Sequence, residues 1–100
     1  MAKDLHFNEL FEEYKVLLTE KQIEVFDLYY NLDLSLGEIS DIKGITRQGV
    51  QDTINKVCKL LDEYEKKLRL VEKKKQILSK LDKIDNKELK KELYSLITEL

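Results

Sequence analysis

Six polar residues between positions 46 and 56 have side chains suited to reading nucleic acid: Thr46, Arg47, Gln48, Gln51, Asn55 and Lys56. Arginine can donate two hydrogen bonds to guanine, and glutamine or asparagine can pair in the same way with adenine. A threonine at a helix start, together with free backbone N–H groups, suits a phosphate. On a helix that buries Val50, Ile54 and Val57, all six residues face outward. The spacing therefore predicts a nucleic-acid-binding surface.

The same pattern also has an ordinary structural interpretation. Arginine and glutamine are common on the solvated side of any helix, and many helix-turn-helix units are purely structural or bind proteins. Asp52 lies in the middle of the predicted surface, where its carboxylate would repel phosphate. Gly49 weakens a helix interior by ~1 kcal/mol relative to alanine, which suggests close approach of a partner to the backbone. Nucleic-acid binding and a protein-binding role both stay open here.

The residues that most often carry catalysis form no constellation. His6 is the only histidine, so no histidine pair can hold a metal, and we expect it at the surface. Cys58 is the only cysteine, which excludes an internal disulfide; we expect it to be buried or half-buried. No glycine-rich phosphate loop is present. We therefore expect neither an enzyme nor a cofactor.

Charge is unevenly distributed along a chain whose net charge is −2. Residues 1–34 carry three basic and eight acidic groups, residues 35–60 carry four and three, and residues 61–100 carry eleven and nine. A dedicated duplex binder has a stronger basic footprint, so any nucleic-acid contact must be local. The most basic stretch, Lys73 to Lys75, is either a solvated helix side or a contact for an RNA backbone or an acidic partner subunit.

No apolar run approaches the ~20 residues that cross a bilayer. The first residues turn acidic where a signal peptide would be basic and then apolar. We therefore expect a cytoplasmic protein with no membrane insertion.

Helices must position these residues, because the chain has no proline and only three glycines. Apolar spacing predicts helices over residues 5–18, from Thr19 to about 30, over 35–44, from Arg47 to about 85, and over about 87–100. Ser35 and Glu38 have the spacing of a capping box, which marks the start of the third helix. The expected fold is an all-α helical bundle with a long C-terminal helix.

Residues 35–61 have the parts of a helix-turn-helix. Ser40 is a small residue where the two helices cross, and Gly44 can adopt the left-handed conformation that a tight turn needs. Val50 and Ile54 are placed to anchor the second helix at a fixed angle. These parts at their joint spacing predict a helix-turn-helix domain over residues 1–60.

Residues 61–100 are expected to form a helical extension for packing or dimerisation. The long helix has an apolar seam that alternates steps of four and three, as in a helix that packs along another: Val50, Ile54, Val57, Leu61, Tyr64, Leu68 and Val71. We expect the small N-terminal bundle to be too short to cover residues 57–71, so the seam predicts a homodimer. The last helix folds back onto Ile77, Leu81 and Ile84 or onto the other subunit.

The motifs resemble region 4 of the sigma-70 class of transcription factors, and more closely the bacterial YlxM-type family of helix-turn-helix proteins. The resemblance covers about residues 5–80. Its matching pieces are Leu18 to Gln22, Leu28 to Tyr30, Ser35 to Ile39, Thr46 to Val50, and Leu61 to Glu65 with Lys67 and Leu68. Ser40 departs from the family, in which alanine is common at that position, and residues after about Ile84 match poorly.

The resemblance implies a role linked to the signal recognition particle, because the family's genes lie beside those for the particle's GTPase or its receptor. The leading hypothesis is a regulatory helix-turn-helix protein that binds DNA or RNA as a dimer and modulates that pathway. The alternative is an adaptor that uses the same fold to contact a protein, including components of the particle, without binding nucleic acid.

Overall fold

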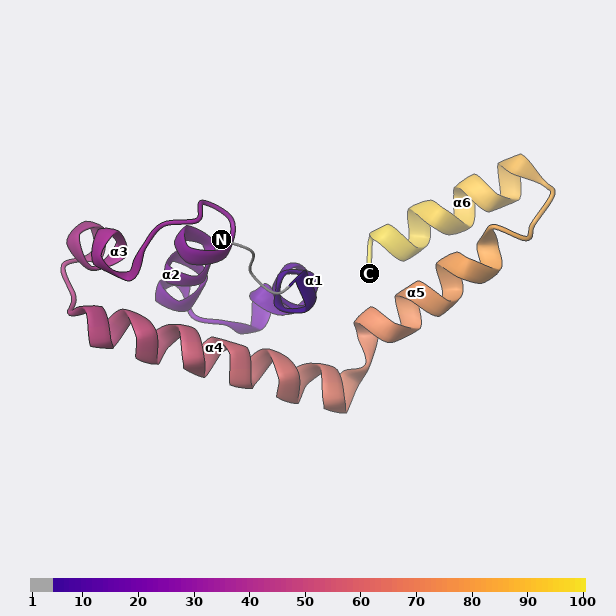
Figure 1. Cartoon of the computed structure of the whole chain (residues 1–100). Coiled ribbons are helices and arrows are strands. Elements are labelled where there is room, and N and C mark those ends of the chain that lie inside the picture. Colours follow the sequence, from indigo (N-terminus) through magenta and orange to yellow (C-terminus); the bar gives the residue numbers. More distant parts are fainter. Residues whose placement is uncertain (1–4) are drawn as a thin grey trace. The chain divides into compact units, whose positions relative to one another are not determined.

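Residues 5–100, which the computed structural model describes, form helices and no strands (Figure 1). The elements are α1 (Leu5–Tyr14), the short 3-10 helix η1 (Lys15–Leu17), α2 (Glu20–Tyr30), α3 (Leu36–Lys43), α4 (Arg47–Leu68), α5 (Leu70–Leu81) and α6 (Lys87–Thr98). The predicted all-α fold class is confirmed. The described chain divides into two units, the first ending at Leu68 and the second running from Arg69 to Leu100.

Side-chain caps start the helices of the first unit where the sequence predicts them. Thr19 accepts a hydrogen bond from the backbone N–H of Gln22, whose side chain accepts from the N–H of Thr19 in return. Ser35 and Glu38 make the same reciprocal pair before α3. Each box satisfies two N–H groups that a helix start leaves without partners.

Gly44 makes the turn between α3 and α4. Its backbone is left-handed, with φ 67° and ψ 32°, a conformation that costs glycine little because it has no Cβ. The N–H of Gly44 donates to the carbonyl of Ser40, and the hydroxyl of Ser40 donates to the carbonyl of Ile45 at 2.5 Å. The small side chain predicted at the helix crossing therefore also ties down the turn.

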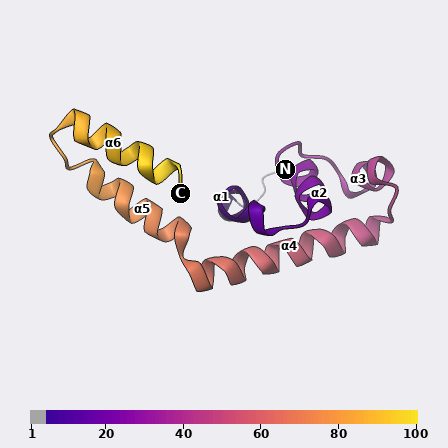
Figure 2. The same ribbon diagram turned by 180° about the vertical axis from the view of Figure 1, so that it is seen from behind.

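The three shorter helices of the first unit lie along one side of α4, as the two opposite views in Figures 1 and 2 show. Val25, Ile39, Val50 and Ile54 are buried together where α2, α3 and α4 meet. Val50 and Ile54 are thus the anchors that the motif requires. Val25 and Phe26, one residue apart in α2, are both fully buried.

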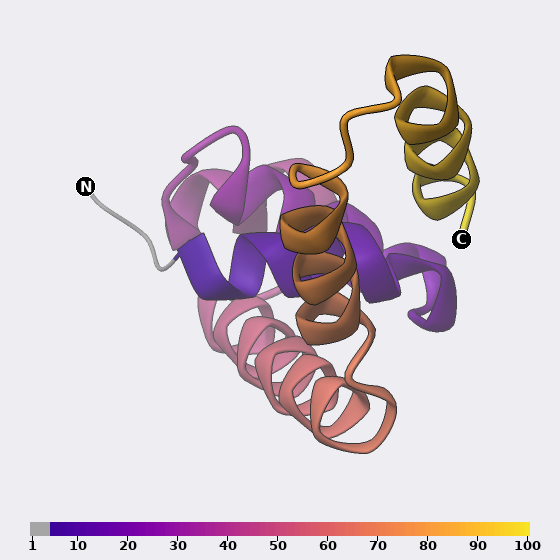
Figure 3. The same cartoon turned by 90° about the vertical axis from the view of Figure 1, so that its right-hand side faces the viewer.

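Aromatic side chains join α1 and α2 above the C-terminal half of α4. Phe26 stacks on Tyr30, with ring centroids 4.3 Å apart, and lies 4.6 Å from the ring of Phe11. Tyr14 packs against Tyr64 at 5.9 Å. Figure 3 shows α1, in indigo, crossing over α4. Because Tyr30 packs in this layer, its ring is held by protein contacts.

The seam of α4 is covered within the same chain. Val57 and Leu61 are fully buried, and the hydroxyl of Tyr14 donates to Glu65 at 2.5 Å. His6 lies 3.2 Å from the carboxylate of Asp62. The expectation that the small bundle leaves residues 57–71 uncovered is therefore wrong up to about residue 65, because α1 extends that far along α4.

The expectation of one helix from Arg47 to about residue 85 is also wrong. Arg69 adopts a left-handed backbone with φ 55° and ψ 30°, which separates α4 from α5. Leu68, the last residue of α4, is 49% exposed, so the first unit no longer covers the apolar side of the helix there. The N–H of Lys73 donates to the carbonyl of Arg69, whose side chain binds Glu72 at 2.8 Å.

The second unit is a hairpin in which α6 packs against α5 (Figure 1). Leu81 of α5 and Ile97 of α6 are its buried apolar residues. Asn86 caps α6 by accepting from the N–H of Leu89. Of the two placements left open for the last helix, the structure has the one in which it folds back onto the preceding stripe.

Among residues 5–100, no helix is both long enough and apolar enough to span a membrane.

Candidate nucleic-acid interface

The outer side of α4 brings the six predicted residues onto one helix. Thr46 precedes α4 and caps it, because its hydroxyl accepts from the N–H of Gly49 at 2.9 Å. Val50, Ile54 and Val57 are buried, so the opposite side faces outward. Gln51 is half-buried, and the remaining five residues are exposed: Thr46, Arg47, Gln48, Asn55 and Lys56. The side chains available to a ligand on this side are therefore mainly amide and cationic groups.

Two hydrogen bonds order the amide side chains along this side. Gln48 donates to the carboxylate of Asp52 at 2.8 Å, and Gln51 donates to the side-chain oxygen of Asn55 at the same distance. Both pairs are four residues apart, the spacing at which side chains on a helix meet. Asp52 has no cation as its partner in this pair, so its negative charge stays on the surface. Each amide keeps further donors or acceptors for a ligand.

Arg47 lies against the first turn of α3. A Cβ placed on Gly37 would be 3.0 Å from a terminal nitrogen of Arg47 and 3.1 Å from its Cζ. Such a distance is below ordinary van der Waals contact, so the guanidinium lies close against the backbone of Gly37 and would have to shift slightly for a larger residue there. Sequence reasoning did not single out Gly37. Its position in the third helix gives no sign of a contact with a residue ten positions later.

Gly49 has a local explanation. A Cβ at this position would lie 3.1 Å from the hydroxyl oxygen of Thr46, which caps the helix through the N–H of Gly49. Its carbonyl accepts from the hydroxyl of Thr53 at 2.9 Å. The close approach that the sequence suggested at Gly49 therefore occurs within the chain, at the cap of α4.

Lys56 stands beside a shallow hollow of about 310 Å³ between α4 and the start of α2. The hollow is lined by Thr19, Lys21, Gln22, Asp52, Thr53 and Lys56. Lys21 was not among the predicted residues. Nothing in the spacing of α4 could place it there, because it belongs to a different helix.

Electrostatic contacts hold α3 in place beside this surface. Lys43 at the end of α3 forms an ion pair with Glu24 of α2. Hydrogen bonds from the backbone and side chain of Ser35 lower the pKa of Glu38 below its ordinary value of 4.5. The Glu38 carboxylate is therefore ionised at neutral pH, at the helix start where a negative charge is favourable.

Cys58 and His6, the two residues that could have carried catalytic or metal chemistry, lie apart from any such site among the described residues. Cys58 is half-buried, and its sulfur lies 4.0 Å from the hydroxyl of Tyr30. The side chain of His6 is 55% exposed. Within residues 5–100, no group of three or more histidine, cysteine, aspartate or glutamate side chains is arranged to hold a metal ion.

Comparisons with known proteins agree with this architecture. The sequence model of a family described as "Putative helix-turn-helix protein, YlxM / p13 like" matches residues 1–100. A UPF0122 protein of Thermoanaerobacter sp. (strain X514) is 49% identical over 75 residues, which cover 75% of this chain and 64% of that relative. The chain therefore spans less than two thirds of that relative's length.

Two other relatives align over more of their length. A UPF0122 protein of Mycoplasma capricolum subsp. capricolum is 44% identical over 89 residues, covering 89% of this chain and 79% of the relative. A UPF0122 protein of Halalkalibacterium halodurans is 42% identical over 104 residues, covering 100% of this chain and 95% of the relative.

Proposed function

The chain belongs to the YlxM / p13-like family of helix-turn-helix proteins, and from this premise we propose that it is a nucleic-acid-binding regulator that reads DNA or RNA with α4. One observation carries the proposal. The outer side of α4 presents Arg47, Gln48, Gln51 and Asn55 while Val50 and Ile54 hold the helix against α3. A helix anchored in this way can enter a major groove with its first turns toward the bases.

The contact between Arg47 and Gly37 supports the same proposal. The guanidinium of Arg47 lies against the first turn of α3, so two helices position this side chain at the start of α4. Thr46 and the first N–H groups of α4 lie beside it and suit a phosphate. In this proposal Arg47 and Gln51 contact bases, Gln48 and Asn55 support them, and Thr46 and Lys56 contact the backbone.

The finer proposal is that this regulator acts in the cytoplasm on the signal recognition particle pathway. Its support is the resemblance to the YlxM-type family, whose genes neighbour those of the particle's GTPase or receptor. The particle's RNA and protein components are therefore the first partners to test.

We propose further that the protein works as a homodimer. The covered seam of α4 no longer supports this, and the support comes instead from α6, where Leu89, Tyr94 and Leu96 are 44%, 54% and 60% exposed. Exposed apolar residues on one short helix suit burial against a second copy. Sedimentation at micromolar concentration would show a species of about twice 11.9 kDa, and a sole 11.9 kDa species would remove the dimer.

A protein-binding adaptor is the second candidate function. The first unit, residues 1–68, carries nine basic and fourteen acidic residues, and Asp52 keeps a negative charge within the outer side of α4. Both features oppose phosphate binding and suit a basic protein surface. An adaptor would retain a protein partner from its own cells after nuclease treatment.

A binding titration separates these functions. The protein is titrated with duplex DNA and with the particle's RNA at two salt concentrations, since phosphate contacts weaken steeply as salt rises. Arg47→Ala and Gln51→Ala are each expected to weaken binding about 5- to 150-fold, from ~1–3 kcal/mol for a base contact. Thermal unfolding of the exposed Arg47→Ala variant should match that of the unchanged protein. If both variants bind as the unchanged protein does, groove reading by α4 is wrong.

A further inference from the structure

The second unit has the opposite charge balance to the first. Residues 69–100 carry nine basic and six acidic residues, whereas residues 1–68 carry nine and fourteen. Nine basic minus six acidic residues give the second unit a formal charge of +3, and nine minus fourteen give the first unit −5. This unit lies outside the helix-turn-helix and contains none of the six residues assigned to base or phosphate contacts above.

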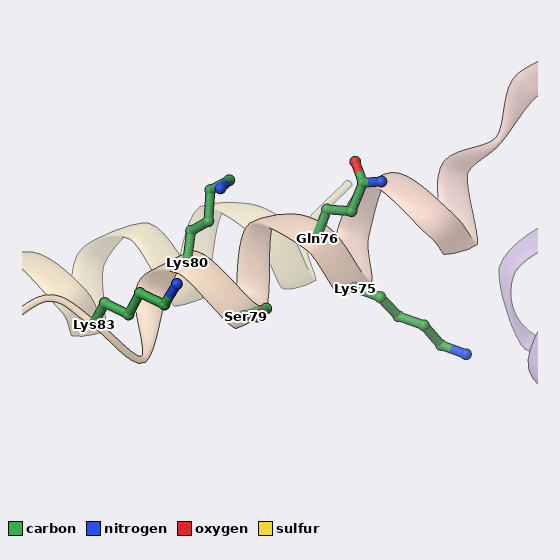
Figure 4. A pocket seen from close by; sticks show the side chains of 5 residues that line it. All are labelled: Lys75, Gln76, Ser79, Lys80 and Lys83. Carbon is green, nitrogen blue, oxygen red and sulfur yellow. The ribbon is translucent and has the colours of Figure 1, made fainter.

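Three lysines and two neutral polar residues line a hollow along α5 and the turn that follows it. A shallow hollow of about 570 Å³ there is lined by Lys75, Gln76, Ser79, Lys80 and Lys83. Figure 4 shows the amide of Gln76 and the ammonium of Lys80 projecting to the same side, with Lys83 reaching back along the helix. Lys75 extends away from them toward the start of α5. Every lining residue has a side-chain donor, and none has a carboxylate.

This side of α5 is the one that α6 leaves open. The half-buried Leu78 and the buried Leu81 lie on the other side of the helix, toward α6. Two of the carboxylates near the lysines in sequence, Glu72 and Asp82, have cations of their own. Glu72 binds Arg69 at 2.8 Å, and Asp82 lies 3.7 Å from Lys90. The side chains of Lys80 and Lys83 form no ion pair with any of residues 5–100.

We propose that this lysine surface, defined by Lys75, Gln76, Ser79, Lys80 and Lys83, binds the phosphodiester backbone of a nucleic acid independently of its sequence. The proposal rests on the function proposed above and adds to it a second contact for nucleic acid, in the second unit. Lysine ammonium groups and neutral serine and glutamine donors are the groups that commonly contact phosphates without reading bases.

The extent and chemistry of the surface favour a nucleic acid over other anions. From Lys75 to Lys80 the helix rises ~7.5 Å, and Lys83 follows just beyond its last residue, so the lysines extend over about two successive phosphate spacings of one strand. The lining residues include no apolar side chain. A protein partner would therefore find no apolar centre to bury here, although specific protein interfaces usually have one.

The test compares the salt dependence of binding in two double variants of the full chain. Lys80→Gln with Lys83→Gln removes two charges from the lysine surface, and Lys87→Gln with Lys91→Gln removes two exposed charges from α6 as a matched control. The probes are a 20-base-pair duplex DNA of scrambled sequence and a 20-nucleotide single-stranded RNA. Circular dichroism checks that each variant keeps its helices.

The Lys80/Lys83 variant should lower the slope of log affinity against log salt by about 1.8 on duplex DNA or about 1.4 on single-stranded RNA, from ~0.9 and ~0.7 per phosphate contact. The probe on which the slope falls shows whether the lysine surface binds duplex DNA or single-stranded RNA. The control variant should change the slope by less than half as much. Equal losses in both variants would show a net-charge effect and overturn the proposal. Equal binding of poly-glutamate, with the same slope, would overturn it as well.

The outcomes for α5 and α4 are separable. If Arg47→Ala weakens binding while Lys80→Gln with Lys83→Gln leaves the salt slope unchanged, the lysine surface is wrong and the proposed function stands. If only the lysine variant loses binding, the lysine surface stands and base reading by α4 is wrong. If the unchanged chain binds neither probe, both proposals fall.

Discussion

Gly44→Ala tests the turn on which the position of α4 depends. Gly44 has φ 67°, and no atom would lie within 4 Å of an added Cβ, so the substitution changes backbone strain without a steric clash. An L-residue in the left-handed region costs ~1–2 kcal/mol. Alanine also restricts the unfolded chain, which returns ~0.4–1 kcal/mol. The expected net loss in the free energy of unfolding is about 1 kcal/mol.

The loss is measurable as a shift in thermal unfolding. For a domain of 60–100 residues, ~1 kcal/mol lowers the Tm by ~4–8 °C. Of the five tyrosines, only Tyr94 lies in the second unit, so near-ultraviolet circular dichroism reports mainly on the first. Gly44→Asn should lose less than Gly44→Ala, because asparagine tolerates the left-handed region better.

Gly37→Ala is the matched control. Gly37 is in the first turn of α3 and has no positive φ, and the group that an added Cβ would meet is the flexible end of Arg47, which can shift. Alanine also restricts the unfolded chain more than glycine does. The Tm of the Gly37→Ala variant should equal or exceed that of the unchanged protein. A Gly44→Ala protein with an unchanged Tm, or equal losses for Gly44→Ala and Gly37→Ala, would refute the left-handed turn as the origin of the effect.

Three further predictions concern the turn, the α4–α5 break and a cap. Ser40→Ala removes the hydrogen bond to the carbonyl of Ile45 and should lower the free energy of unfolding in urea by ~1 kcal/mol; no change would mean that the hydroxyl adds nothing. Arg69→Val places a β-branched residue at φ 55° and should lower the Tm, whereas Arg69→Gly should not; equal effects would contradict the strained backbone. The pKa of Glu38 is lowered in the fold, so its cap contributes above the ordinary pKa and is lost as pH falls through the folded value. The amide proton of Ser35 should titrate with a midpoint below 4.5 in NMR spectra, and Glu38→Gln should abolish that titration.

The sequence predicts the parts of this fold that depend on local chemistry. The cap at Ser35, the turn at Gly44 and the cap at Thr46 each follow from a side chain or a missing Cβ acting within four residues. The buried positions Val50 and Ile54 follow from helical spacing alone. Such signals can be read without knowing what else in the chain is nearby.

The features that the sequence analysis missed depend on contacts between distant residues or on strain. Arg69 carries no sign of a left-handed backbone, because the residues typical of that conformation are glycine and asparagine. Leu17 and Ile42 are apolar residues within the helices predicted over residues 5–18 and 35–44. They are nevertheless 51% and 60% exposed, since no neighbouring helix extends over them. The role of the six candidate residues at the start of α4 remains a prediction. Helical spacing could place them on the side away from Val50 and Ile54, but it could not give the hydrogen bonds that their side chains make.

The contact between Arg47 and Gly37 makes the candidate interface a property of two helices. Arg47 belongs to α4, but the space that its guanidinium fills is provided by the backbone of α3. The angle between these helices is set by the left-handed Gly44 and by the hydrogen bond from Ser40. A change at the turn should therefore displace Arg47 even when both helices stay folded, and the loss of nucleic-acid affinity should exceed the loss expected from stability alone.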